Sequence, residues 1–162
     1  MIDKYAKYNK IYTDGSICNN IRGCALIVGE EIFRFKLPQY FSIFSCELFA
    51  IEKGLDLIEE QKIKKAIICT DSKSAIDALK NPANHDEDVQ RCQSKLSKIS
   101  LSMEIIIAWI PAHQEIHGNE TADLNAKQAT TDGIDLSTSL PTSVNDLKKY
   151  IKKHIQDEWN KR

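Results

Sequence analysis

The spacing of hydrophobic residues changes several times along the chain, and each change marks an expected element. Apolar residues alternate with polar ones or run without interruption at about 9–14, 23–28 and 31–37, which is typical of strands joined by tight turns. Two later runs, 66–70 and 104–109, are continuously apolar, as expected for strands covered on both faces. The first three strands are close enough in sequence to form an antiparallel meander.

Between and after these runs, apolar residues recur every three or four positions, which predicts helices. The expected helices cover residues 45–60, 72–79, 87–99, 119–130 and 144–159. Ser45 is a candidate cap for the first of them. A meander followed by alternating strands and helices predicts an α/β fold with one mixed five-stranded sheet and helices on both faces.

The composition changes this picture little. With 162 residues, 42% hydrophobic and 28% charged, the chain is typical of one soluble domain. The net charge of −1 argues against a tight, non-specific nucleic-acid binder, so such a partner would need a local patch. Five cysteines without a C-x-x-C pair indicate neither zinc nor disulfides. With no signal peptide or membrane-spanning run, we expect an intracellular protein, cytoplasmic or nuclear.

Four acids occupy positions that packing does not explain. Asp14 and Asp71 each end a buried-type strand, and Glu47 and Asp123 lie near helix starts. Any one of them alone is more often a helix cap or a solvated acid. Four carboxylates brought together would repel unless a hard cation neutralised them, and oxygen ligands suit Mg²⁺ or Mn²⁺. Two such ions can drive a phosphodiester displacement, whereas no Walker loop or Ser-His-Asp arrangement is present.

Four blocks carry a resemblance to a known family. They are residues 12–16 (Tyr-Thr-Asp-Gly-Ser), 45–51 (Ser-Cys-Glu-Leu-Phe-Ala-Ile), 69–75 (Cys-Thr-Asp-Ser-Lys-Ser-Ala), and the pair 109–113 (Trp-Ile-Pro-Ala-His) and 118–123 (Gly-Asn-Glu-Thr-Ala-Asp). In this order they resemble the type 1 ribonuclease H family over about residues 10–130. The amino-acid sequences of residues 42–48 and 146–151 are most similar to those of the ribonuclease H domains of non-LTR retrotransposon polyproteins.

The resemblance implies a ribonuclease H-like fold and endonucleolytic cleavage of the RNA strand of RNA–DNA hybrids with two metal ions, Mg²⁺ or, in its place, Mn²⁺. It implies that Asp14, Glu47, Asp71 and Asp123 are metal ligands. His113 matches a loop histidine that assists proton transfer or product departure, with His117 as the runner-up. We expect residues 1–131 to form the catalytic domain and residues 132–162 to be a linker and an amphipathic helix extending it.

Substrate recognition is expected beside the first acid. The family uses the turn containing Gly15 and Ser16 to contact 2′-hydroxyls, the groups that distinguish RNA from DNA. Asn20 and Ser42 are weaker candidates for holding the DNA strand or its phosphates, and a purely structural role is the commoner explanation for each. Many cellular members have an asparagine pair where this chain has Ile43 followed by phenylalanine, so part of that surface differs.

The chain also departs from some members of the family in the basic surface that could supply affinity for the hybrid. No basic protrusion fits between Asp71 and Trp109, and the segment includes the acidic run 86–88. Phosphate contacts account for much of nucleic-acid affinity. The remaining basic surfaces are 62–65 and the C-terminal helix, whose lysines are more simply explained as a solvated face. We expect a monomer, with a reverse transcriptase domain in cis if the parent is a polyprotein.

Two alternatives remain open at this point. One is a catalytically silent member of the same fold that binds nucleic acid or acts as a scaffold. The intact acids argue against it, because a silent member would be expected to lose them first. The other is a nuclease of the same superfamily that acts on DNA. The Thr-Asp-Gly-Ser block and the spacing of His113, Gly118, Asn119 and Asp123 favour the ribonuclease.

Overall fold

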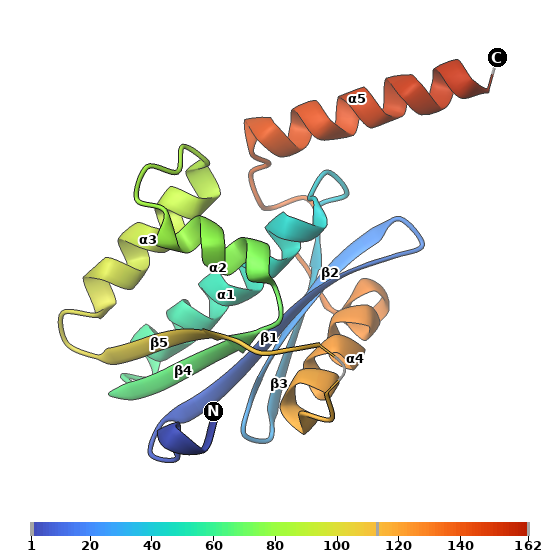
Figure 1. Cartoon of the computed structure of the whole chain (residues 1–162). Helices are drawn as coiled ribbons and strands as arrows, with labels where there is room; N and C mark the ends of the chain where they lie inside the picture. Colours follow the sequence, from blue (N-terminus) through green and yellow to red (C-terminus); the bar gives the residue numbers. More distant parts are fainter. Residues whose placement is uncertain (1, 113, 162) are drawn as a thin grey trace.

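The computed structural model describes residues 2–112 and 114–161. Within them the chain forms one six-stranded sheet with the order β5-β4-β1-β2-β3-β6 (Figure 1). The strands are β1 (Asn9–Cys18), β2 (Ile21–Val28), β3 (Glu31–Leu37), β4 (Lys65–Thr70), β5 (Glu104–Trp109) and β6 (Ile134–Asp135). β1, β2 and β3 pair antiparallel, and β4 and β5 join parallel to β1. The expected mixed sheet is therefore confirmed.

Helices cover both faces of this sheet, as the sequence predicts. They are α1 (Ile43–Glu60), α2 (Lys73–Lys80), α3 (Glu87–Ile99), α4 (His117–Asp132) and α5 (Val144–Asn160), and a 3₁₀ turn (Ile2–Tyr5) precedes β1. α1, α2 and α3 lie on one face and α4 on the other, while α5 projects from one end of the molecule (Figure 1). The main hydrophobic core fills the layer between the sheet and α1.

The β1–β2 hairpin is longer than the sequence indicates. The connection between the strands expected at 9–14 and 23–28 is reduced to Asn19 and Asn20, whose φ angles are 50° and 62°. Asparagine tolerates this left-handed conformation, and two such residues make the tight turn that matches the twist of paired strands. Cys18 therefore pairs directly with Ile21, and β1 continues four residues past Asp14.

α1 begins two residues earlier than expected, and the prediction that Ser45 caps it is wrong. Ser42 is the N-cap, because its hydroxyl accepts a hydrogen bond from the backbone N–H of Ser45 at 3.2 Å. The buried face of α1 has helical spacing and packs on β1 and β4. Its fully enclosed apolar residues include Leu48, Ile51, Leu55 and Ile58.

α4 packs closely on the opposite face because both surfaces carry small residues. A Cβ at Gly23 of β2 would lie 2.8 Å from the carbonyl oxygen of Ala126 and 3.0 Å from the Cβ of Ala129. Glycine at this position lets the helix backbone approach the strand, and the stripe of alanines on α4 makes the same approach possible from the other side.

The segment after α4 contributes a strand that the sequence does not reveal. β6 has only two residues, and it pairs parallel with Phe35 and Lys36 of β3. The described residues therefore form six strands where the sequence predicts five, because a two-residue strand inside a polar segment leaves no hydrophobic pattern.

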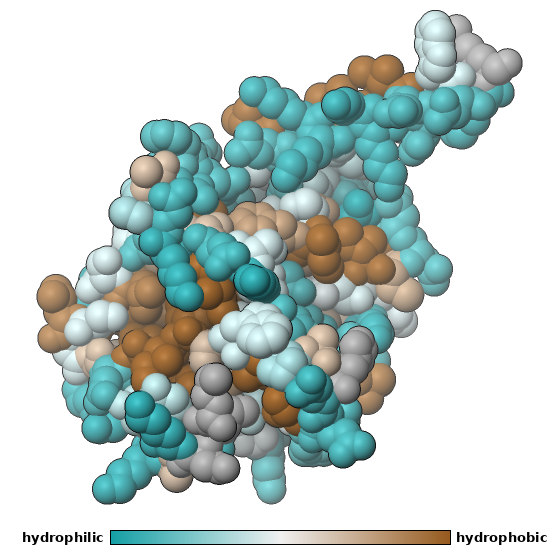
Figure 2. Space-filling view, in the orientation of Figure 1, coloured by the Kyte–Doolittle hydropathy of each residue, from teal (hydrophilic) through white to brown (hydrophobic). Residues whose placement is uncertain are grey.

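Among the described residues, α5 is buried against the rest of the molecule only in its first turns. Asp146 is buried and accepts a hydrogen bond from the backbone N–H of Ser42 at 3.3 Å, and Tyr150 packs edge-on against Tyr40. From Ile151 onward every described residue of α5 is exposed. Figure 2 shows brown, apolar side chains along the edge of α5 that points away from the body.

In the part of the chain that the structure describes, no helix combines the length and the apolar character required to cross a membrane.

The core on the α1 face can be tested at Leu55. Leu55→Ala should lower the free energy of unfolding by about 2–5 kcal/mol, because this side chain is fully enclosed and its truncation leaves a cavity. Leu101→Ala is the matched control. Leu101 is 90% exposed, so its truncation should change stability by less than about 0.5 kcal/mol in urea denaturation. Equal losses in the two variants would contradict this account of the core.

Candidate active site

Three of the four predicted acids converge at the centre of the sheet. Asp14 lies within β1, Glu47 lies one turn into α1, and Asp71 directly follows β4. Each offers a carboxylate oxygen, and these oxygens all lie within 4.8 Å of one another. Asp14 is in the middle of its strand and not at the strand end, because the hairpin extends beyond it. The convergence itself agrees with the prediction.

Gly15 allows this convergence. A Cβ at Gly15 would lie 2.7 Å from the backbone nitrogen of Glu47 and 2.8 Å from the Cβ of Cys46. No real side chain tolerates such distances, so glycine lets the start of α1 rest directly on β1. The side chain of Glu47 is thereby brought to that of Asp14. Close packing is thus one role of Gly15, and contact with substrate stays a prediction.

Burial and mutual repulsion change the ionisation of these acids. Burial, followed by the charge of Asp71, raises the pKa of Asp14 to about 7. Burial, followed by the charge of Asp14, raises the pKa of Glu47 to about 9. Asp14 is 6% and Glu47 8% exposed, so water offers little compensation. Without a cation, the cluster therefore retains protons near neutral pH.

Another acid on α1 shows the contrasting arrangement. Glu52 is also buried, but Arg91 of α3 binds its carboxylate at 2.9 Å and Lys95 at 3.1 Å. Burial alone would raise the pKa of Glu52, yet these two partners outweigh it and the pKa is lowered. Glu52 is neutralised by the protein itself, whereas the active-site acids have no comparable protein cation among the described residues.

The donor set fits a hard divalent cation. All three groups are carboxylates, and Oε2 of Glu47 is buried without a hydrogen-bond partner among the described residues. An unpartnered buried carboxylate oxygen is unfavourable unless something positive binds it. Mg²⁺ and Mn²⁺ prefer oxygen ligands of this kind.

Asp123, the fourth predicted ligand, lies at the margin of this cluster. It is on α4, half-exposed, and its carboxylate forms an ion pair with Lys127 at 2.6 Å. It is outside the group of three, but its charge contributes to the raised pKa of Asp14, so it faces the same site. Its role as a metal ligand stays a prediction.

Asn119 is a site residue that the sequence reasoning did not select. It is buried on α4, and its amide nitrogen donates to Oδ2 of Asp71 at 3.3 Å. The indole N–H of Trp109 donates to the backbone carbonyl of Asp71 at 3.1 Å. The two contacts fix Asp71 from its side chain and its backbone. Both residues belong to the motif blocks of the sequence analysis, but those blocks do not show that the two residues hold Asp71 in place.

The remaining predicted site residues differ in their location and in their contacts. Ser16 is buried beside Asp14 on β1. Ser42 caps α1, and the side-chain oxygen of Asn20 accepts a hydrogen bond from Arg22 at 2.7 Å. His113 lies outside the described residues. His117, the runner-up, is the exposed first residue of α4.

A buried cluster of carboxylates at the centre of a mixed sheet defines a class of metal-dependent enzyme sites. The sequence model of the RNase H family matches residues 6–131, so the chain belongs to that family, whose members are divalent-metal-dependent ribonucleases H. Ribonuclease H activity is accordingly the enzyme activity of this chain.

The fold comparison agrees with this membership. One similar solved structure is RNase H1 from the halophilic archaeon Halobacterium salinarum NRC-1, with a TM-score of 0.58 and 18% identity. The match covers 75% of this chain and 96% of the archaeal chain, and it shows that the fold is RNase H-like. No curated protein sequence gives a significant match.

The raised pKa values predict how stability depends on pH. A carboxyl whose pKa is higher in the folded state stabilises the fold fully below its unfolded pKa, about 4, and loses that contribution as pH rises through its folded pKa. The metal-free protein should therefore lose stability from about pH 5 to pH 9, through the values near 7 and 9 for Asp14 and Glu47. Added Mg²⁺ should raise the melting temperature more at pH 8 than at pH 6, because it binds the deprotonated acids.

Thermal unfolding of variants assigns that effect to the cluster. Asp14→Asn combined with Glu47→Gln should flatten the pH dependence and remove most of the response to Mg²⁺. Glu30→Gln, at an exposed turn, should behave like the wild type. A double variant that keeps the wild-type response would show that the metal binds elsewhere.

Proposed function

We propose that this protein hydrolyses the RNA strand of RNA–DNA hybrids by a two-metal mechanism, with Mg²⁺ as the natural ion and Mn²⁺ able to replace it. The observation that carries the proposal is the buried cluster of Asp14, Glu47 and Asp71 within a chain of the RNase H family. Four blocks of the family's motifs, in the same order, support the finer activity.

The residues that would hold the two ions are Asp14, Glu47 and Asp71, with Asp123 completing the second site. When bound, the ions would activate a water and stabilise the leaving oxygen of the scissile phosphodiester. The contribution of the protein is to position the ligand oxygens. Asn119 orients the carboxylate of Asp71 through its 3.3 Å hydrogen bond, so the ligand oxygens are arranged before substrate arrives.

Recognition of the RNA strand is assigned to the residues beside Asp14. Gly15 and Ser16 follow it on β1, where a backbone group and a hydroxyl can meet a 2′-hydroxyl. His113 is proposed to assist proton transfer or departure of the product. Ser42 has a structural role as N-cap, and a contact of Ser42 with a DNA phosphate would be additional to that role.

The wider context is also a proposal. The amino-acid sequences of residues 42–48 and 146–151 support a non-LTR retrotransposon origin, with a reverse transcriptase domain in cis. The domain would be a monomer inside the cell, in the cytoplasm or the nucleus. Residues 1–131 would be the catalytic unit and 132–162 its extension. The pairing of β6 with β3 supports treating that extension as part of the same domain.

Cleavage of a labelled hybrid tests the activity directly. With Mg²⁺ the purified protein should cut the RNA strand and leave duplex DNA intact. Asp71→Asn should reduce cutting by at least about 100-fold with little effect on folding, because it removes a ligand charge and keeps the shape. Asp77→Asn, an exposed acid on neighbouring α2, should keep wild-type activity.

Three outcomes would separate the alternatives. Undiminished cutting by Asp71→Asn would refute the two-metal assignment. Comparable cutting of duplex DNA would favour a DNA-directed nuclease of the superfamily. Binding of the hybrid without cutting in either metal would favour a silent binding module.

A further inference from the structure

One face of α5 carries four exposed lysines that the proposed mechanism does not use. They follow Asp146 within two turns of the helix and are Lys148, Lys149, Lys152 and Lys153. The last three line an open groove of about 440 Å³ along the helix, together with Gln156, Asp157 and Asn160. We call the four lysines the lysine face of α5.

No ion pair within the described residues neutralises the lysine face. Elsewhere an exposed lysine does find a carboxylate, as Lys98 of α3 does with Glu59 at 2.7 Å. Within the face, lysines four residues apart repel each other, at the spacing where an acid would stabilise the helix. Asp157, four residues after Lys153, borders the groove but forms no ion pair with it among the described residues, so the groove keeps a net charge of +2 from three lysines and one aspartate. This charge is available to an anion from outside the chain.

The rest of the chain makes the lysine face its main basic surface. Residues 1–143 contain 16 lysines and arginines and 20 aspartates and glutamates, which gives a net charge of −4. The other basic surface that the sequence offers, residues 62–65, is weakened because Lys65 forms an ion pair with Glu104 at 2.9 Å. The body as a whole therefore repels a polyanion, whereas α5 attracts it.

The direction of the lysine face favours a polyanion over a lipid surface. At about 100° per residue, the exposed apolar residues of α5 form a stripe within about 60° of Val144 on either side. They are Val144, Leu147, Ile151, Ile155 and Trp159. Lys149 and Lys153 lie about 140° and 180° from Val144, so they point away from any flat surface that covers the stripe. A membrane would leave these lysines unbound, whereas a phosphate backbone can follow the lysine face by itself.

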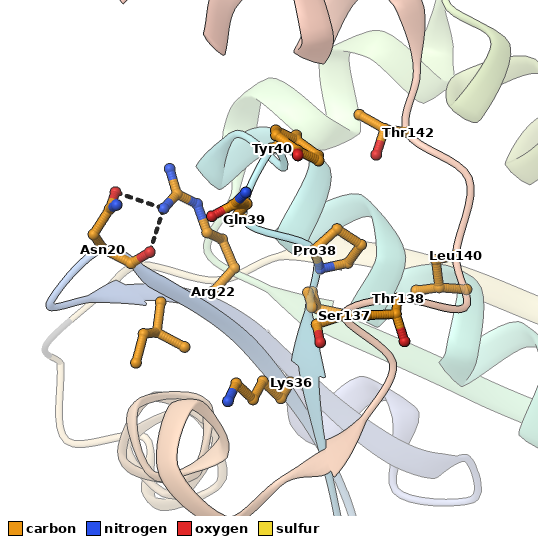
Figure 3. Close-up of a pocket in the computed structure, with 12 residues that line it drawn as sticks. Asn20, Arg22, Lys36, Pro38, Gln39, Tyr40, Ser137, Thr138, Leu140 and Thr142 are labelled. Carbon is orange, nitrogen blue, oxygen red and sulfur yellow. Dashed lines mark hydrogen bonds between the residues drawn. The ribbon is translucent and has the colours of Figure 1, made fainter. Parts of the chain in front are cut away.

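The first turns of α5 are fixed to the start of α1. Figure 3 shows Tyr40 and Thr142 where the β3–α1 connection meets the segment that enters α5, and both residues line the same pocket. The ring of Tyr40 packs on that of Tyr150, with centroids 4.7 Å apart. Asp146 is buried and accepts a hydrogen bond from the backbone N–H of Ser42 at 3.3 Å. The lysine face is therefore held at a defined place beside the helix that carries one of the acids.

This place lies within reach of a duplex that covers the acids. Ser42 precedes Glu47 by five residues and Lys148 follows Asp146 by two, which at the rise of a helix correspond to about 8 and 3 Å. Because Asp146 contacts Ser42, the backbone of Lys148 lies within about 20 Å of Glu47. About 20 Å is about six base-pair steps of about 3.4 Å each. A duplex that extends this far beyond the acids on the side of α5 meets the lysine face.

We propose that the lysine face of α5 binds the phosphate backbone of the nucleic acid where it extends beyond the acidic cluster. This inference rests on the proposed function. The segment between Asp71 and Trp109 has no room for a basic protrusion, and α5 supplies a basic surface from another part of the chain. Affinity for the substrate is thereby provided at a surface separate from the metal ligands.

Salt-dependent binding of a hybrid of about 20 base pairs in EDTA tests the lysine face without cleavage. Each lost phosphate contact should reduce the slope of log K against log salt by about 0.9. Lys149→Gln combined with Lys153→Gln should therefore reduce the slope by about 1.8, so that this glutamine variant loses about tenfold less affinity than wild type between 50 and 200 mM salt.

Two control variants separate the charge of the face from the structure of α5. Lys4→Gln combined with Lys7→Gln removes the same charge from exposed lysines near the N-terminus, at the opposite end of the molecule from α5 (Figure 1), and should keep the wild-type slope. Lys149→Arg combined with Lys153→Arg keeps the charge and should also keep the slope. An unchanged slope in the glutamine variant would overturn the proposal. An equal fall in the arginine variant would overturn it too, because the cause would then be a disrupted helix, which far-UV circular dichroism would detect.

Two further arms test another anionic partner and separate this proposal from the activity. If wild type binds vesicles of phosphatidylcholine and phosphatidylserine and the glutamine variant does not, while both bind hybrid with one slope, the partner is an anionic membrane and the proposal is overturned. A reduced slope in a protein that cuts no hybrid with Mg²⁺ would support the lysine face and refute the proposed function. Normal cutting with unchanged slopes would do the reverse.

Discussion

Three carboxylates held within 4.8 Å of one another cannot all be charged unless a cation lies between them, and this constraint organises the molecule. Glu47 reaches Asp14 only because α1 begins against Gly15, and α1 can begin there only because the β3–α1 connection ends in the Ser42 cap. Asp71 is then fixed by Asn119 from the opposite face of the sheet. Without a cation the cluster retains protons, and a divalent cation bound by the three carboxylates would take their place.

The contrast with Glu52 shows that this repulsion is a feature of the site and not of buried acids in general. Glu47 and Glu52 belong to the same helix and are similarly buried. Arg91 and Lys95 of α3 neutralise Glu52, whereas Glu47 faces two further acids. The middle of α1 is therefore neutralised by the protein's own cations, whereas the acid in its first turns requires an external ion. Stability and metal binding are consequently linked at one end of a single helix.

The sequence predicts the mixed sheet and most strands well because they depend on local patterns, and it singles out the three acids that lie together in the structure. It fails where tertiary contacts decide. Asp14 lies within β1 because two asparagines adopt positive φ angles and extend the hairpin, which hydrophobic spacing does not report. β6 is too short to have a period. Asn119 belongs to a block that the sequence marks, but its task depends on Asp71, 48 residues away, so the local pattern does not show that it orients a metal ligand.

The two glycines of the β1–β2 pair have a consequence for how change at one face reaches the other. Gly15 supports α1 and Gly23 supports α4, and the two lie in adjacent rungs of the ladder, opposite Cys24 and Ser16 respectively. At these two glycines the backbones of α1 and α4 approach the sheet closely, so little space is left to absorb a displacement. A bulkier residue at Gly23, on the α4 face, would therefore push β2 towards α1, and with it the paired strand β1 that carries Asp14. The hairpin is held between two helices, so a change on the α4 face alters the position of Asp14 relative to Glu47 on α1.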